Sequence, residues 1–262
     1  MNLSLEGKRA VVCGSTQGIG KAIAIMLSKQ KANLTLIARD ENKLKDVLKT
    51  LENSNNQKHN FIVADFNYPR KLEKKINDFL SEGNKAEILI NNTGGPPSGQ
   101  IIEAKKEEFD QYISMHLHCS HYLVKALVPH MKKVKFGRII NIISISVKAP
   151  IENLGVSNTV RWAMASWSKT LSFELGKFGI TVNNILPGFT LTDRLKDLML
   201  ARSKIYNKSI EKIEKEYKNI IPAQRFATPE EIASATSFLC SKKASYINGI
   251  NLPIDGGYSG NL

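Results

Sequence analysis

The chain has 262 residues, of which 42% are hydrophobic, and this is enough for one large α/β domain with a buried sheet. We find no low-complexity linker, so the sequence predicts a single domain over residues 1–262. The start, "MNLSLEGKRAVVCG", lacks the features of a secretory signal, and no apolar stretch approaches ~18 residues, so neither export nor a membrane span is expected. The three cysteines, Cys13, Cys119 and Cys240, lack CxxC spacing, which favours free thiols in the cytoplasm.

The net charge of +13 favours acidic partners, because surface charge steers association. The lysines are scattered among acids in segments of helical period, and no basic run is interleaved with aromatic residues. Solvated helix faces therefore explain the charge better than a nucleic-acid surface, which remains an alternative resting on charge alone.

Seven short runs rich in β-branched residues alternate with longer segments of helical period. The runs predicted as strands are "KRAVVC", "NLTLIA", "NFIVAD", "EILIN", "GRIINII", "ITVNNIL" and "NLPID". The segments predicted as helices are residues 20–30, 43–52, 71–80, 106–133, 156–178 and 229–240. This alternation is typical of repeated βαβ units, so we expect a doubly wound, parallel seven-stranded α/β fold of the Rossmann type, with helices on both faces.

Residues 192–221 interrupt the alternation after the sixth strand. They are rich in Lys and Glu and have helical spacing. An insertion at the carboxyl edge of a parallel sheet is placed to act as a substrate lid, and a surface helix without such a role is the alternative.

A glycine-rich turn joins the first strand to the first helix. In "VVCGSTQGIGKAIA", the residues Gly14, Gly18 and Gly20 have G-x3-G-x-G spacing. This spacing permits a tight turn that brings backbone N–H groups and a helix N-terminus against a pyrophosphate. The context predicts a dinucleotide site, although the same turn also occurs without a ligand.

The end of the second strand, "LIARDE", distinguishes the two nicotinamide cofactors. Arg39 stands where an acid would indicate NAD. An arginine cannot accept hydrogen bonds from ribose hydroxyls, but it can bind a 2′-phosphate. NADP(H) is therefore the favoured cofactor, and NAD(H) is the alternative.

With these motifs the chain resembles the short-chain dehydrogenase/reductase family over nearly its whole length. "CGSTQGIG" resembles the family's TGxxxGxG motif, with Cys13 in place of the threonine. "VADFN", "NNTGG", "PGFTLT" and "INGINLPIDGG" resemble four further family motifs. The cofactor-binding residues that we expect from the motifs and the resemblance are Gly14, Ser15, Thr16, Gln17, Gly18, Ile19, Gly20, Arg39, Asp65, Phe66, Asn92, Gly94, Arg161, Pro187, Gly188, Thr190 and Thr192.

The catalytic residues usual in that family are mostly absent. The resemblance implies a Ser, a Tyr, a Lys four residues later and a helix Asn. Ser144 matches the serine, whereas Ser157, Arg161 and His116 stand at the other three positions. An aliphatic hydroxyl is a far weaker acid than a phenol of pKa ~10, and a guanidinium stays protonated. The usual proton relay is therefore not expected.

His116 is a candidate replacement for the missing acid. An imidazole of pKa ~6.5 suits proton transfer, and the resemblance directs His116 to the cleft that holds Ser144 and Ser157. We hypothesise that His116, directly or through Ser157 or a water, delivers the proton while NADPH supplies hydride. The alternative is a histidine that only packs or hydrogen-bonds, for example at a subunit contact.

Two other chemistries are disfavoured. Among the clustered histidines only His118 and His121 share a helix face, and no carboxylate joins them at ligand spacing, so no metal site is predicted. Ser144 lacks the strained nucleophile elbow of a hydrolase.

The sequence therefore predicts an NADP-dependent oxidoreductase acting on a carbonyl/alcohol pair. "IPAQRFATPEEIA" resembles the ketoacyl-reductase branch, which implies a small-molecule or carrier-bound acyl substrate, such as a 3-oxoacyl thioester. The alternative is a catalytically silent nicotinamide-binding sensor or assembly protein, because Ser157 and Arg161 break the catalytic pattern. The resemblance also implies a homotetramer or homodimer, with the helices that carry His116 and Arg161 packed between subunits.

Overall fold

A parallel sheet forms the centre of the computed structural model, which describes residues 2–260. Its strand order is β3-β2-β1-β4-β5-β6-β7, and all neighbours are parallel. The strands are β1 (Arg9–Cys13), β2 (Asn33–Ala38), β3 (Asn60–Val63), β4 (Ile88–Asn91), β5 (Gly137–Ile142), β6 (Ile180–Pro187) and β7 (Asn251–Ile254). The strand order reverses between β1 and β4, and such sheets bind ligands beyond the carboxyl ends at this point. The predicted doubly wound seven-stranded fold is confirmed.

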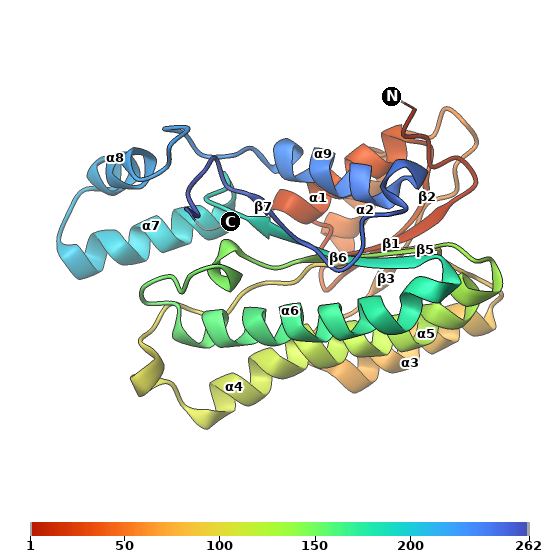
Figure 1. The fold of residues 1–262 in the computed structure, drawn as a ribbon, viewed down its shortest axis with the longest axis horizontal. Helices are drawn as coiled ribbons and strands as arrows, with labels where there is room; N and C mark the ends of the chain where they lie inside the picture. Colours follow the sequence, from red (N-terminus) through yellow and green to blue (C-terminus); the bar gives the residue numbers. More distant parts are fainter. Residues whose placement is uncertain (1, 261–262) are drawn as a thin grey trace.

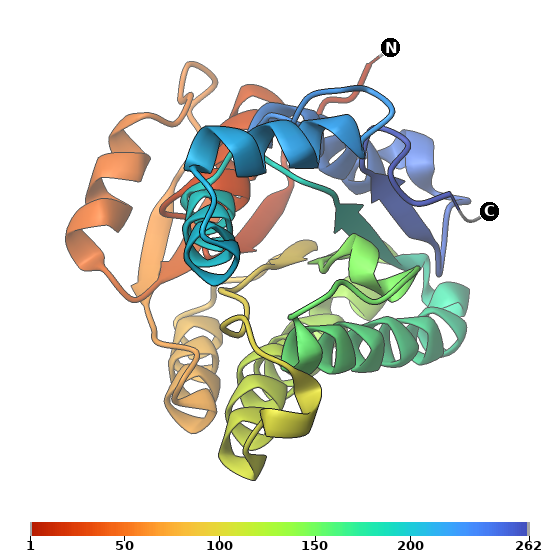
Figure 2. The ribbon, with the colours of Figure 1, turned by 90° about the vertical axis from the view of Figure 1, so that its left-hand side faces the viewer.

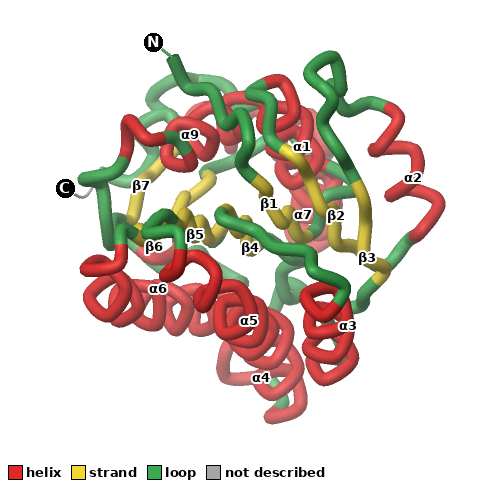
Figure 3. Tube along the Cα trace, turned by 90° about the vertical axis from the view of Figure 1, so that its right-hand side faces the viewer, coloured by secondary structure: helices red, strands yellow, loops and turns green. Residues whose placement is uncertain are grey.

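Helices cover both faces of the sheet (Figures 1 and 3). One layer holds α1 (Gly18–Lys29), α2 (Glu41–Lys49) and α9 (Pro229–Cys240). The other holds α3 (Pro69–Ser81), α4 (Lys106–Ile113), α5 (Cys119–Lys133) and α6 (Gly155–Leu175). In α3 the buried Leu72, Ile76 and Phe79 recur at helical spacing and form one apolar stripe. Burial of such stripes against the strands holds the layers together.

One expected helix is interrupted. The sequence predicts a continuous helix over residues 106–133, but a π-helical turn at Ser114–His118 separates α4 from α5. A π turn adds a residue to one helical turn without changing the apolar composition. The prediction of one unbroken helix was therefore wrong at this turn, which buries His116.

Residues 192–221 form two helices beside the carboxyl ends of the strands, α7 (Asp193–Tyr206) and α8 (Ile210–Asn219) (Figure 2). Leu195, Met199, Ile213 and Tyr217 from these helices pack with Phe226 in a small apolar cluster of their own. The segment is thus a structured helical pair.

Four asparagines cross the sheet in register, Asn91 on β4, Asn141 on β5, Asn184 on β6 and Asn251 on β7. Each side-chain amide donates to the next one, with N···O distances of 2.8, 2.9 and 2.7 Å. A slip of one residue would turn these side chains to the other face of the sheet, so the asparagine row specifies the strand register.

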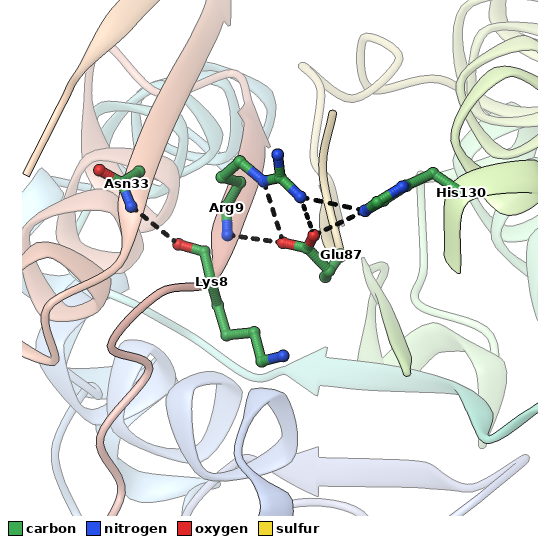
Figure 4. A network of polar contacts seen from close by, with 5 residues as sticks. All are labelled: Lys8, Arg9, Asn33, Glu87 and His130. Carbon is green, nitrogen blue, oxygen red and sulfur yellow. Dashed lines mark hydrogen bonds and ion pairs between the residues drawn. The ribbon is translucent and has the colours of Figure 1, made fainter. Parts of the chain in front are cut away.

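A second polar network lies at the opposite, amino-terminal edge of the sheet (Figure 4). Glu87 accepts from the backbone N–H of Arg9 at 2.9 Å and from Nε of the same residue at 3.3 Å. His130, near the end of α5, lies 2.7 Å from the same carboxylate. The network joins β1, the start of β4 and α5, and it is remote from the ligand edge.

Candidate functional site

A cavity of about 800 Å³ opens at the carboxyl edge of the sheet, between the strand ends and α7–α8. Its walls include most of the residues expected from the sequence: Gly14, Thr16, Gln17, Gly18, Ile19, Arg39, Asp65, Phe66, Asn92, Gly94, Ser144, Ser157, Arg161, Pro187, Gly188, Thr190 and Thr192. Ser15, Gly20 and His116 do not line it. The volume suits a dinucleotide together with a small substrate.

The glycine turn at one end of the cavity is packed without room for side chains. Gly14 has φ +56°, and a Cβ there would lie 2.7 Å from Nδ2 of Asn92. A Cβ on Gly20 would lie 2.1 Å from the carbonyl oxygen of Gly14. Asn92 itself donates to the carbonyl oxygens of Cys13 and Gly14 at 3.3 and 3.2 Å. The asparagine after β4 therefore fixes the shape of the turn after β1.

The residues of this turn fit a phosphate group. No side chain caps α1, and its first turn holds no acid, so its leading N–H groups face the cavity without a competing carboxylate. The hydroxyl of Ser15 is buried and has no hydrogen-bond partner among the described residues. A phosphate oxygen in the cavity supplies an acceptor for the N–H groups of α1, whereas Ser15 lies behind the wall and is not one of its donors.

Residues that follow β2 and β3 form another part of the cavity wall. The exposed Arg39 makes no ion pair within residues 2–260 and lies on the cavity wall with Lys43. The Asp65 carboxylate accepts from the backbone and side-chain amides of Asn67, at 2.9 and 3.0 Å. Lys43 lies 3.9 Å from the carboxylate of Asp40, so Arg39 is the cation of this wall that best suits a 2′-phosphate.

Ser144 and Ser157 both line the cavity, although Ser144 follows β5 and Ser157 belongs to α6. Ser144 Oγ accepts from the backbone N–H of Ser146 at 3.1 Å. Because that bond uses the oxygen as acceptor, the Ser144 O–H remains available to donate toward the cavity.

Arg161 is 92% buried, a rare state for an arginine. Its Nη1 donates to the carbonyl oxygen of Ile142 at 3.2 Å, while Nε has no partner among the described residues. Burial, and secondarily the positive charge of Arg194, lowers the pKa of Arg161 to about 10. The side chain is still a cation at neutral pH.

His116 lies behind the cavity wall and is 3% exposed. Its Nε2 is 3.1 Å from the carbonyl oxygen of Gly94, so this nitrogen carries the proton and donates. Burial, assisted by the charge of Arg161, lowers the pKa of His116 well below its usual value. Because its imidazole is neutral and its N–H already donates to Gly94, His116 is placed to hold the loop that contains Gly94 in position.

Sequence reasoning missed several residues of the cavity wall, above all Arg194 on α7. Its Nη2 donates across the cavity to the carbonyl oxygen of Pro96. Other missed wall residues come from the helical pair and the C-terminal turn: Leu198, Ile205, Tyr206, Tyr217, Ile220 and Tyr258. Arg194 directly follows the "PGFTLTD" stretch, but nothing local shows that its side chain turns back toward Pro96.

Among residues 2–260, no three His, Cys, Asp or Glu side chains gather closely enough to hold a metal ion. Within the same residues, no helix has the length and apolar character needed to cross a membrane.

Together, the fold and the cavity define an α/β dinucleotide-binding protein. Part of the cavity wall carries the polar side chains of Ser144, Ser157 and Arg161. A family model described as enoyl-(acyl carrier protein) reductase matches residues 14–259. The chain belongs to the short-chain dehydrogenase/reductase family, and it is an NAD(P)-dependent oxidoreductase.

Curated relatives match over almost their full length. The 3-oxoacyl-[acyl-carrier-protein] reductase FabG of Salmonella typhimurium is 33% identical over 258 residues, which cover 97% of this chain and 98% of the relative. FabG of Chlamydia muridarum is 30% identical over 262 residues, 98% of this chain and 99% of the relative. The chain is thus similar to ketoacyl reductases, as the sequence predicted.

Solved structures agree on the fold. L-sorbose reductase from Gluconobacter frateurii, complexed with NADPH and L-sorbose, superposes with a TM-score of 0.92 at 31% identity and full coverage of both chains. YwfH, an NADPH-dependent reductase involved in bacilysin biosynthesis, gives a TM-score of 0.91 at 28% identity over 97% of this chain and 99% of YwfH.

Proposed function

We propose that this protein is an NADP(H)-dependent reductase of a carbonyl compound, in which a proton donor other than tyrosine completes the reaction. The observation that carries the proposal is that one cavity is lined both by the glycine turn and Arg39 and by Ser144, Ser157 and Arg161. Its cofactor is NADP(H). The NADPH-dependent structural relatives support this assignment.

The part of the cavity that holds Ser144, Ser157 and Arg161 can reduce a carbonyl group as follows. When bound, NADPH supplies the hydride that reduces the carbonyl carbon. Ser144 donates its free O–H to the carbonyl oxygen and orients it. Arg161 stabilises the negative charge that develops on that oxygen. A water held by Ser144 and Ser157 gives the oxygen a proton and is itself reprotonated by the solvent, so that C=O becomes CH–OH.

His116 supports this arrangement from behind the wall. The sequence suggested that His116 either delivers the proton or only packs or hydrogen-bonds, and its bond to Gly94 favours the second role. In this proposal His116 is a positioning residue that fixes the loop after β4, and the proton comes from solvent through the serine hydroxyls.

The relatives' names suggest a 3-oxoacyl thioester as the substrate. We propose that α7 and α8 act as the lid over it, because Tyr206 and Arg202 of α7 reach Glu152 on the opposite wall at 3.3 and 3.8 Å. These contacts join the lid to the loop that precedes α6.

We further propose that the protein is a cytoplasmic homo-oligomer. The three cysteines are unpaired and buried, which suits a reducing compartment. Trp162 and Phe173 on α6 expose 50% and 77% of their surface, about three helical turns apart, and such aromatic positions are typical of an interface.

The test is a titration of cofactor-free protein with NADPH and NADH, followed by turnover of acetoacetyl-N-acetylcysteamine, an uncharged 3-oxoacyl thioester. Saturable binding that prefers NADPH, with NADPH oxidation when substrate is added, is the expected result. Failure to bind either nucleotide would refute the reductase proposal. Binding without turnover of any carbonyl compound would favour the silent sensor.

A further inference from the structure

Two arginines from different helices meet at one point of the cavity wall. A methyl group built on Gly95 would lie 3.3 Å from Nη2 of Arg161 and 3.8 Å from Nη2 of Arg194. Arg161 comes from α6 and Arg194 from the first turn of α7. Both line the cavity, next to Ser144 and Ser157.

No carboxylate of the described chain neutralises this pair. Within residues 2–260, neither Arg161 nor Arg194 forms an ion pair, and both donate to backbone carbonyls. Asp197 is the acid whose charge Arg194 feels most, yet it is too far away to form an ion pair with it. Two close, largely buried cations cost free energy unless an anion lies between them.

Arg161 also has an unused donor. Its Nε–H is buried without a partner among the described residues, although the side chain is 92% buried. A guanidinium presents five N–H donors in a fixed fork, which matches the two oxygens of a carboxylate. Some N–H groups of Arg161 can therefore donate to a ribose hydroxyl while others donate to an anion.

The cofactor phosphates have their own subsites elsewhere in the cavity. The glycine turn follows β1 and Arg39 follows β2, whereas the arginine pair lies over β4 and β5. β4 is the direct neighbour of β1 and β5 is the next strand along, so the arginine pair lies about 5–10 Å from the glycine turn at the usual strand spacing. The pair is free to bind an anion of the substrate.

The remaining walls near the pair are apolar or aromatic. They include Ile145, Ile151, Leu198, Ile205 and Tyr258. We propose that Arg161 and Arg194 bind a carboxylate of the substrate, so that the substrate class is an oxo acid with an apolar body. This inference rests on the reductase proposed above and names its substrate as a free oxo acid, in place of the thioester that the relatives' names suggest.

The experiment uses benzoylformate, an oxo acid that cannot enolise, and its uncharged isostere benzoylformamide. Calorimetric titration of the NADP⁺-saturated protein should show the acid binding at least about tenfold more tightly than the amide. Arg194→Gln should remove that preference and leave NADPH affinity unchanged. Lys196→Gln, which removes an exposed cation from the same helix, should change neither quantity.

Three outcomes would overturn the inference. One is equal binding of acid and amide by the wild-type protein. Another is no binding of the acid at millimolar concentrations. The third is a loss of NADPH affinity in Arg194→Gln that matches the loss of acid affinity, which would assign the pair to the cofactor. Because NADPH binding to the wild-type protein is measured separately, each of these results is distinct from failure of the reductase proposal.

Discussion

We expect the side chain of Arg39 to decide which nicotinamide cofactor this cavity holds. Arg39 is exposed at the end of β2 and makes no ion pair within the described chain, so its charge is available to a ligand. Charge-assisted hydrogen bonds contribute about 1.5–3 kcal/mol each. Arg39→Ala should therefore weaken NADPH binding about 10–100-fold and leave NADH binding unchanged, as measured by fluorescence titration. Lys45→Ala on the outer face of α2 is the control, and equal losses for both cofactors would contradict the assignment.

The role of His116 can be separated into positioning and proton transfer with two substitutions. Glutamine keeps an N–H donor that can reach the Gly94 carbonyl, and leucine does not. If His116 positions the loop, His116→Gln retains turnover, and His116→Leu raises the KM for NADPH. If the imidazole supplies the proton, both variants lose turnover about 100-fold at unchanged KM.

The residues of the site differ in how far the sequence could predict them. Gly14, Gly18 and Arg39 were predictable because the chemistry of phosphate binding fixes their spacing and their place after a strand. The geometry of Arg161 and Arg194 was not, because each side chain turns toward Gly95 only through contacts made after α6 and α7 have packed.

At the scale of elements, short β-branched runs located all seven strands to within a few residues, and the helix predicted over residues 229–240 coincides with α9. The π turn at Ser114–His118 escaped prediction because it shifts the helical phase without a change of composition. The π turn contains His116, whose side chain hydrogen-bonds to the carbonyl oxygen of Gly94. This bond can form only when the loop that contains Gly94 has folded.

The network at the amino edge of the sheet gives a pH-dependent contribution to stability. Burial raises the pKa of Glu87, but the hydrogen bonds from Arg9 and His130 outweigh it and lower that pKa below its ordinary value. A lowered carboxyl pKa stabilises the fold above the unfolded pKa of ~4.3, and this stability is lost as the pH falls through the folded pKa.

We therefore expect Glu87→Gln to reduce the free energy of unfolding by about 2 kcal/mol at neutral pH. Urea unfolding at a series of pH values should show this difference shrinking below pH ~4, where the wild-type carboxylate also becomes protonated. Glu41→Gln, which breaks an exposed pair with Lys45, should cost less than about 0.5 kcal/mol. A pH-independent deficit in Glu87→Gln would point to packing instead.

At the scale of the whole molecule, α6 gives the proposed oligomer a specific surface. Phe173 exposes 77% of its area on this helix, whose other side contacts the sheet. Phe173→Glu should shift the protein toward monomers in sedimentation experiments, because an interface core excludes an unpaired charge. Ile210→Glu, at the start of α8, should leave the assembly unchanged. A wild-type protein that sediments as a monomer would refute the oligomer proposal.

The asparagine row across β4 to β7 has a direction, because each amide donates toward β7. Conversion of Asn91, Asn141 or Asn184 to aspartate would place two acceptors face to face in the buried sheet. Asn251, at the exposed end, only accepts in this row and could lose its amide nitrogen without loss of a bond. Loss of the amide nitrogen would therefore break the row at three of these positions and leave it intact at the fourth.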